Sequence, residues 1–191
     1  MSWVLLILVE AQAAGLDIIT EEGVTVVVRG VGETWADPHL GEAYRPSAFM
    51  GGVGLVIPLH PMLVLDLEAA AGRWIGSALE CDVCLDTRLS VRPLSLVIEG
   101  RVPLDRGYAF AGVGPSLAVF SEESGSTVTG EKGSLDLRIG LRWDLGMEFE
   151  RTRGTSLELY GGRRMQRNEP DLADGFDLAA WRGSVGIGFT F

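Results

Sequence analysis

The sequence predicts an all-β protein, an eight-stranded antiparallel up-and-down transmembrane β-barrel, and three observations support this class. The first is the strict alternation in residues 184–191, where apolar residues at odd positions face one way and small residues at even positions face the other. The second is a series of eight alternating segments separated by alternately long and short connections. The third is that the apolar faces carry no charge, as a lipid-facing band requires.

Each predicted strand is a run in which apolar residues alternate with polar or small ones. The connections over 36–46, 76–85, 121–133 and 166–178 are long and polar, those around 58–61 and 150–154 are short, and 98–106 is intermediate. Long loops outside the cell and short periplasmic turns are typical of outer-membrane barrels. The predicted strands are Gly23–Trp35, Ser47–Ile57, Met62–Ile75, Asp86–Val97, Gly107–Phe120, Ser134–Leu145, Thr155–Met165 and Ala179–Phe191.

The two faces can be assigned strand by strand, because successive side chains of a strand point to opposite sides. The first strand places Arg29 on its polar face, and the third alternates leucine with Asp66. The fourth sets Arg88 against neighbouring apolar residues. The sixth alternates leucine with aspartate and arginine, and the seventh opposes Glu158 to two leucines. The period alone does not decide between a soluble barrel or sandwich with a dry core and a membrane barrel with a polar lumen.

The composition of the polar faces favours the membrane barrel, because they carry arginine and carboxylate in equal number. Eight strands enclose only enough space for side chains, and guanidinium groups that pair with carboxylates fit such an interior. The solvated face of an acidic chain should instead share its negative charge. We therefore expect a lumen ion-pair network of Arg29, Asp66, Glu68, Arg88, Arg92, Asp136, Arg138, Arg142, Glu158, Arg164 and Arg182, with Glu33, Asp86 and Asp144 on the same faces.

The opposite faces should contact lipid, and aromatic residues should form girdles at the two membrane surfaces. The expected lipid-facing residues include Leu65, Leu137, Leu141, Leu157, Val185 and Ile187. Toward the loop ends of their strands lie Trp35, Phe49, Trp74, Phe120 and Trp181, although Trp35 and Trp74 fall in the lumen phase. Toward the turn ends lie Tyr108, Phe110, Trp143, Phe189 and Phe191.

The beginning of the chain predicts export. Residues 3–9 form an apolar run and 11–13 a small-x-small site, which together are typical of a signal peptide over residues 1–14 followed by a barrel domain over 15–191. The run is shorter than the roughly 20 residues that a membrane-spanning helix needs. It also lacks a basic start, so a first buried strand is the alternative interpretation. The formal charge of -10, with Lys132 as the single lysine, argues against nucleic-acid binding.

Two cysteines lie close together in the second long connection. Cys81 and Cys84 predict a local disulfide in an exported protein. A redox pair would need a nearby helix or base to lower a thiol pKa, and the sequence offers neither. A zinc site would need further ligands, such as His39 and Glu80.

Catalytic and metal sites are not predicted. The chain has two histidines, and His60 lies between two prolines in a short turn. His39 lies in a long connection, where nothing fixes its distance from a serine or carboxylate. The acidic residues of 166–178 do not match a calcium-binding EF-hand loop. We therefore expect no enzyme activity, no cofactor and no metal.

The end of the chain resembles the C-terminal assembly signal of bacterial outer-membrane barrels, with Ser184, Gly186, Phe189 and Phe191 in its four fixed places. The whole chain resembles the small eight-stranded outer-membrane barrels of the OmpA-transmembrane-domain and OmpX type. The resemblance implies a monomer in the outer membrane of a Gram-negative bacterium, with a cleaved signal peptide. Its implied partners are membrane lipid, lipopolysaccharide and, through the last strand, the barrel-assembly machinery.

The resemblance indicates a location more than an activity. We expect a structural barrel whose acidic loops serve envelope integrity, surface interaction or adhesion. A narrow channel for small or apolar solutes is the alternative, and a lipid-modifying enzyme is the third possibility.

Overall fold

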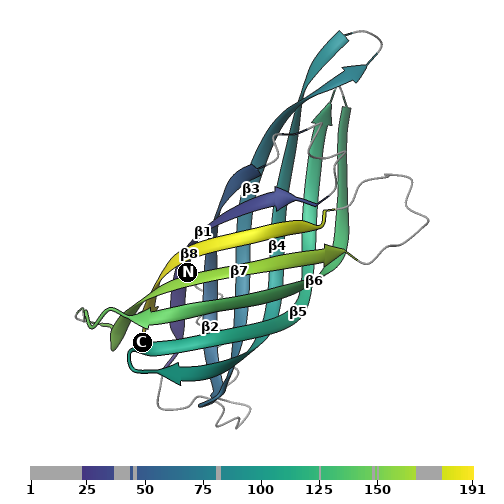
Figure 1. Ribbon diagram of the computed structural model, residues 1–191. Coiled ribbons are helices and arrows are strands. Elements are labelled where there is room, and N and C mark those ends of the chain that lie inside the picture. Colours follow the sequence, from purple (N-terminus) through teal and green to yellow (C-terminus); the bar gives the residue numbers. More distant parts are fainter. Residues whose placement is uncertain are drawn as a thin grey trace, which may run out of the picture.

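A computed structural model shows a closed antiparallel barrel in which each strand pairs with its neighbours in the chain and β1 pairs with β8 (Figure 1). The structure describes residues 23–36, 44, 47–80, 83–124, 126–147, 149, 151–166 and 178–191. The predicted signal peptide, Cys81 of the predicted disulfide and His39 lie outside these residues. The strands are β1 Thr25–Trp35, β2 Ser47–His60, β3 Leu63–Glu80, β4 Val83–Leu104, β5 Gly107–Ser124, β6 Ser126–Asp144, β7 Gly154–Gln166 and β8 Ala180–Thr190.

The structure confirms the predicted fold class, and the ladders fix its register. Thr25 at the start of β1 lies opposite Thr190 of β8, and Trp35 at its end lies opposite Ala180. On its other side, β1 pairs with β2 from Thr25 to Thr34. The barrel is therefore closed by hydrogen bonds between its first and last strands, which pair along the whole of β1 from Thr25 to Trp35.

Two of the predicted long connections are wrong. Residues 76–80 and 83–85 are the paired ends of β3 and β4, and residues 121–124 and 126–133 belong to β5 and β6. The intermediate connection is also strand as far as Leu104, with a turn at Asp105 and Arg106. We call the end of the barrel formed by the tips of the β3–β4 and β5–β6 hairpins the extended end, and the opposite end the turn end. Figure 1 shows both hairpins reaching beyond the rest of the barrel.

The predicted aromatic girdles are only partly correct. Phe49 and Trp181 are exposed on the outer wall, as is Trp143 at the turn end. In contrast, Phe110 and Phe120 are buried inside the barrel, as are Trp35 and Trp74, whose lumen phase predicted this position. Their inward positions follow from strand phase, because each shares its face with the other inward residues of its strand.

The β4–β5 turn depends on Gly107, whose φ is 114°. A side chain there is strained, and a Cβ would also collide with the backbone of Arg142. We expect Gly107→Ala to lower the free energy of unfolding by about 1–3 kcal/mol. Gly133→Ala is the control, because nothing lies within 4 Å of the Cβ it would add. Urea unfolding of the refolded barrel in detergent, followed by tryptophan fluorescence, measures both; equal midpoints would contradict the argument.

Candidate functional site

The centre of the lumen is occupied by an arginine that contacts carboxylates from two sides of the barrel. Arg29 of β1 donates from Nη2 to Asp66 Oδ2 at 2.5 Å and from Nη1 to Glu68 Oε2 at 2.8 Å, both on β3. Its Nε donates to Glu158 Oε1 of β7 at 2.6 Å. All four side chains are almost fully buried. Such charge-assisted bonds offset the cost of removing the charges from water only because each charge has a partner.

Further arginines extend this network toward the extended end. Arg182 of β8 contacts Glu33 at 2.8 Å, Glu68 at 2.9 Å and Asp136 at 2.9 Å. Arg164 of β7 also contacts Glu33, at 2.7 Å. Each carboxylate here accepts from more than one strand, so the ion pairs link distant parts of the barrel wall.

With the remaining arginines, the network contains equal numbers of arginine and carboxylate side chains. Arg138 lies between Asp66 and Glu68, at 3.2 and 3.3 Å, and packs over the ring of Tyr160. Arg142 pairs with Glu158. The lumen ion-pair network therefore consists of Arg29, Arg138, Arg142, Arg164 and Arg182 with Glu33, Asp66, Glu68, Asp136 and Glu158.

Below Arg142 a polar cavity of about 320 Å³ lies at the turn end. The ring of Tyr108 lies between two guanidinium groups, with Arg101 Cζ at 5.0 Å and Arg142 Cζ at 5.3 Å from its centroid. Arg101 also donates to the carbonyl oxygen of Pro61 at 2.9 Å. Arg142 thus lines this cavity and also belongs to the lumen ion-pair network.

Two members of the predicted network do not lie in the lumen. Arg88 and Arg92 are exposed on the outer wall of β4, and this part of the prediction is wrong. The inward residues at this level are their apolar neighbours Leu89 and Val91. Asp144, expected on the same polar faces, is also exposed, at the end of β6.

Sequence reasoning missed a buried carboxyl group, Glu99 of β4. Only 1% of Glu99 is exposed, and it interacts electrostatically with Asp66, Arg142 and Glu158. Ser95 on the same face donates to Asp136 Oδ2 at 2.6 Å. The signal was present, because the alternation of β4 continues beyond Val97, where we had expected the strand to end.

Toward the extended end, the polar interior gives way to an apolar cluster. Trp35 and Trp74 pack together with their ring centroids 4.9 Å apart. The cluster consists of Val31, Trp35, Tyr44, Met50, Ala70, Trp74, Leu89, Val91, Ala118, Phe120, Leu178 and Ala180. This apolar plug, as we name it, fills the lumen above the ion-pair network.

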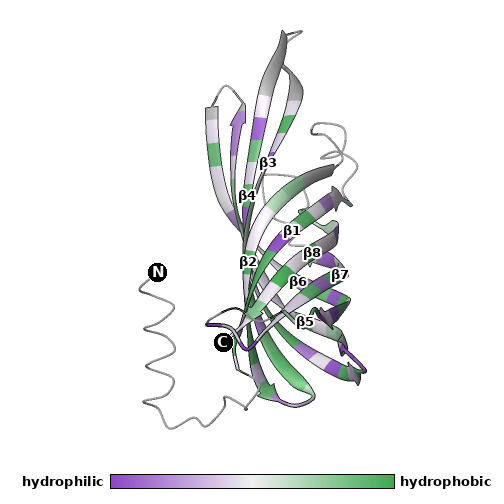
Figure 2. Cartoon of the chain, turned by 90° about the vertical axis from the view of Figure 1, so that its left-hand side faces the viewer, coloured by the Kyte–Doolittle hydropathy of each residue, from purple (hydrophilic) through white to green (hydrophobic). Residues whose placement is uncertain are grey.

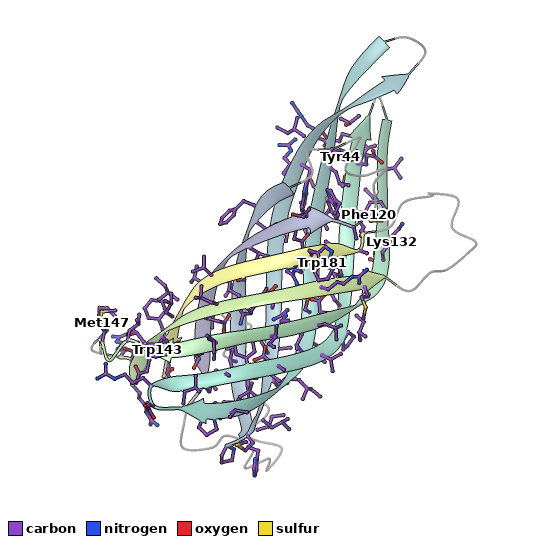
Figure 3. The ribbon with its side chains drawn as sticks, in the orientation of Figure 1. Tyr44, Phe120, Lys132, Trp143, Met147 and Trp181 are labelled. Carbon is purple, nitrogen blue, oxygen red and sulfur yellow. The ribbon has the colours of Figure 1, made fainter. Side chains whose placement is uncertain are left out.

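Tyr44 covers the plug from the connection between β1 and β2. It forms an isolated β-bridge with Gly76 of β3, and its hydroxyl donates to Glu122 of β5. Burial, together with this hydrogen bond, raises the pKa of Tyr44 above its usual value, so the hydroxyl stays protonated and remains a donor. Figure 3 shows Tyr44 and Phe120 near the extended end, with Trp143 and Met147 at the opposite end.

The outer wall changes from apolar to polar at the level where the interior changes from polar to apolar. Along β4 the outward residues are apolar over 94–104 and include Leu94, which is 53% exposed, and Ile98, which is 50% exposed. This length matches the roughly 9–11 residues of a tilted transmembrane strand. Beyond it the outward residues are Arg92, Ser90 and Arg88. A strand with polar residues inside and apolar ones outside thus becomes one with apolar residues inside and polar ones outside, the change expected where a strand of a membrane barrel leaves the bilayer.

Comparisons with known proteins support the fold. No family model matches the sequence, and no curated protein matches it. OprG from Pseudomonas aeruginosa aligns with a TM-score of 0.61 at 12% identity, over 91% of this chain and 98% of that one. Ail of Yersinia pestis, in complex with the heparin analogue sucrose octasulfate, aligns at 0.53 and 11%, over 89% and 99%. Neisserial surface protein A aligns at 0.51 and 12%, over 88% and 96%.

These three structures share the barrel architecture of the chain, and their low identities make the likeness one of fold. Within the described residues, no helix is long and apolar enough to cross a membrane. His60, one of two residues considered for catalysis, is exposed at the end of β2, where its Nδ1 accepts a hydrogen bond from the Met62 backbone at 3.2 Å. Buried side chains fill the lumen, and the ends of β3–β6 extend beyond the rest of the barrel.

Proposed function

We propose that this chain is a Gram-negative outer-membrane protein whose barrel anchors a surface-exposed sheet, formed by the extended ends of β3–β6, that binds other proteins. The observation that carries the proposal is the simultaneous inversion of the inner and outer faces beyond the apolar band. It leaves a paired sheet with a largely apolar inner face on one side of the membrane. The closed lumen favours this role over a channel.

Placement in the outer membrane is supported by the apolar outer wall and by the last strand. In β8, Phe189 and the adjoining Phe191 lie on the outward face, whereas Ser184 and Gly186 lie inward. The four residues that resemble the assembly signal therefore place two aromatic rings on the outer wall, beside the β1–β8 seam. We propose that the barrel-assembly machinery reads this strand and that lipid and lipopolysaccharide surround the outer wall.

Protein binding is supported by an edge of β6 along which no strand pairs within the described residues; we call it the free edge of β6. Residues 126–133 pair with β5, whereas the described part of β7 pairs with β6 only from Ser134 onward. The Leu145 backbone N–H points toward β7, where it donates to Thr155 at 2.9 Å. Antiparallel strands alternate the direction of these groups, so the N–H groups of Thr127 and Thr129 point toward the same free edge. Both residues are exposed, and neither they nor Val128 between them carries a charge, so this part of the edge can accept an added strand.

The membrane part is tested by refolding the chain into lipid vesicles and comparing unboiled with boiled samples on a denaturing gel. A folded membrane barrel resists the detergent until boiled, so the two bands should separate. A single band, from a protein that remains monomeric without detergent, would contradict membrane insertion.

The binding part is tested by selecting phage-displayed random peptides against the refolded barrel. We expect extended peptides with alternating β-branched residues, which lose about tenfold or more in affinity on Thr129→Pro because proline removes an edge donor. Thr129→Val keeps the N–H and the strand preference, and should bind as the parent does. Equal binding to all three proteins would place the interaction elsewhere.

The adhesion class agrees with the printed name of one structural neighbour, the attachment invasion locus protein Ail. The agreement is one of functional class; the argument itself rests on the free edge of β6.

A further inference from the structure

Three arginines lie together on the outer wall of β3 and β4, immediately beyond the apolar band. Arg88 and Arg92 flank Ser90 along β4, each about 7 Å away along the strand. Arg73 of β3 lies directly opposite Ser90, and Ser121 of β5 lies opposite it on the other side. We call these five residues the boundary patch. Figure 2 shows hydrophilic segments on β3 and β4 at and above this level.

The boundary patch is basic in an acidic protein. All three arginines are exposed, whereas the whole chain carries a formal charge of -10. The neighbouring acid is Glu123, which lies opposite Arg88 on the ladder and 3.9 Å from Arg73 Nη2. Both side chains of that ion pair are 55% exposed, so solvent screens it. Among the side chains that the structure describes, Glu123 is the carboxylate paired with the patch, and the three guanidinium groups exceed it in charge.

The chemistry of the patch fits a phosphate group. Guanidinium groups bind phosphate oxygens with two parallel hydrogen bonds, and serine hydroxyls can donate further ones. Because Ser90 and Ser121 face each other across the β4–β5 ladder, both hydroxyls lie among the arginines. A charged group bound here would therefore meet donors from three adjacent strands.

The position of the boundary patch, directly beside the apolar band, favours a lipid as the source of the phosphate. The next outward residues of β4 are Leu94 and Leu96, which are exposed and start the apolar band. We propose that the boundary patch binds the phosphate of an anionic lipid while its acyl chains lie along these leucines. A soluble polyanion would gain nothing from the leucines and would be repelled by the surrounding negative charge. The inference rests on the proposed membrane location.

The test compares lipid retention by three refolded proteins in nanodiscs of phosphatidylcholine with a minority of phosphatidic acid. They are the parent chain, a variant with Arg73→Gln, Arg88→Gln and Arg92→Gln, and a control with Arg106→Gln, Arg151→Gln and Arg153→Gln at the turn end. Native mass spectrometry counts the lipids that stay bound. We expect the parent and the control to retain phosphatidic acid preferentially, and the boundary-patch variant to lose about tenfold of that preference.

The outcomes separate the two proposals. Loss of the preference in the boundary-patch variant alone supports the lipid site. Equal retention by all three proteins, or equal loss in both variants, overturns it while the heat-dependent band shift still reports insertion. Binding of soluble heparin through the same arginines, without any phosphatidic acid preference, also overturns it. A parent chain that shows no band shift overturns the membrane location itself.

Discussion

Replacing Arg29 by leucine should lower the free energy of unfolding by about 3–5 kcal/mol, the cost of breaking a buried ion pair from one side. The single side chain of Arg29 contacts all three of Asp66, Glu68 and Glu158. Its loss therefore removes one partner from each of three buried carboxylates. The urea midpoint of the refolded barrel in lipid vesicles measures the effect.

The matched control for this change is Arg106→Leu. It removes the same side chain from an exposed site in the β4–β5 turn, where an arginine contributes little to stability. We expect its urea midpoint to stay close to that of the parent chain. If both variants unfold at the parent's urea midpoint, the buried contacts of Arg29 do not stabilise the barrel. If the midpoints of both variants fall by the same amount, the change reflects solubility or refolding yield and not the buried contacts.

The sequence predicted the barrel because its signals are local and repeated. The alternation of β8, the valines around Arg29 and the equal numbers of arginine and carboxylate each report a strand with one apolar and one polar face. Strand count and chain order follow from these runs. The same alternation placed Arg29, Asp66 and Glu158 on inward faces, where the structure brings them together.

The errors occur where the solvent changes along a strand. Arg88 and Arg92 alternate with apolar residues as Arg138 and Arg142 do, yet the first pair points outward and the second inward. Period alone is symmetric between these arrangements, and only the level of the membrane surface breaks the symmetry. For the same reason, polar residues beyond the surface suggested loops where the chain continues as paired strand.

Individual ion pairs could not be predicted either. Which carboxylate meets Arg182 depends on the stagger between β8, β1, β3 and β6, and this stagger is a property of the closed barrel. Glu99 shows the related difficulty that an expected strand end hides an inward residue. Both require the register of strands that are distant in sequence.

The second large effect concerns the apolar plug. Trp74 is 1% exposed and packs on Trp35, so Trp74→Ala should cost about 3–5 kcal/mol through the cavity it leaves. Trp181→Ala removes the same side chain from the outer wall, where Trp181 is 58% exposed, and should cost much less. Urea midpoints in vesicles compare the two variants.

Conductance in a planar lipid bilayer tests whether the apolar plug and the lumen ion-pair network close the barrel in series. Trp74→Ala opens space above the network, which still fills the lumen below; Arg138→Leu weakens the network, but the plug remains above it. We therefore expect each single variant to stay at the baseline of the parent chain, and ion flow to require both changes together. If one of the single variants conducts, the layer that it alters, the plug or the network, is sufficient by itself to block ion flow in the parent chain. In that case the solute-channel alternative would regain support, because one rearrangement would suffice to open the barrel.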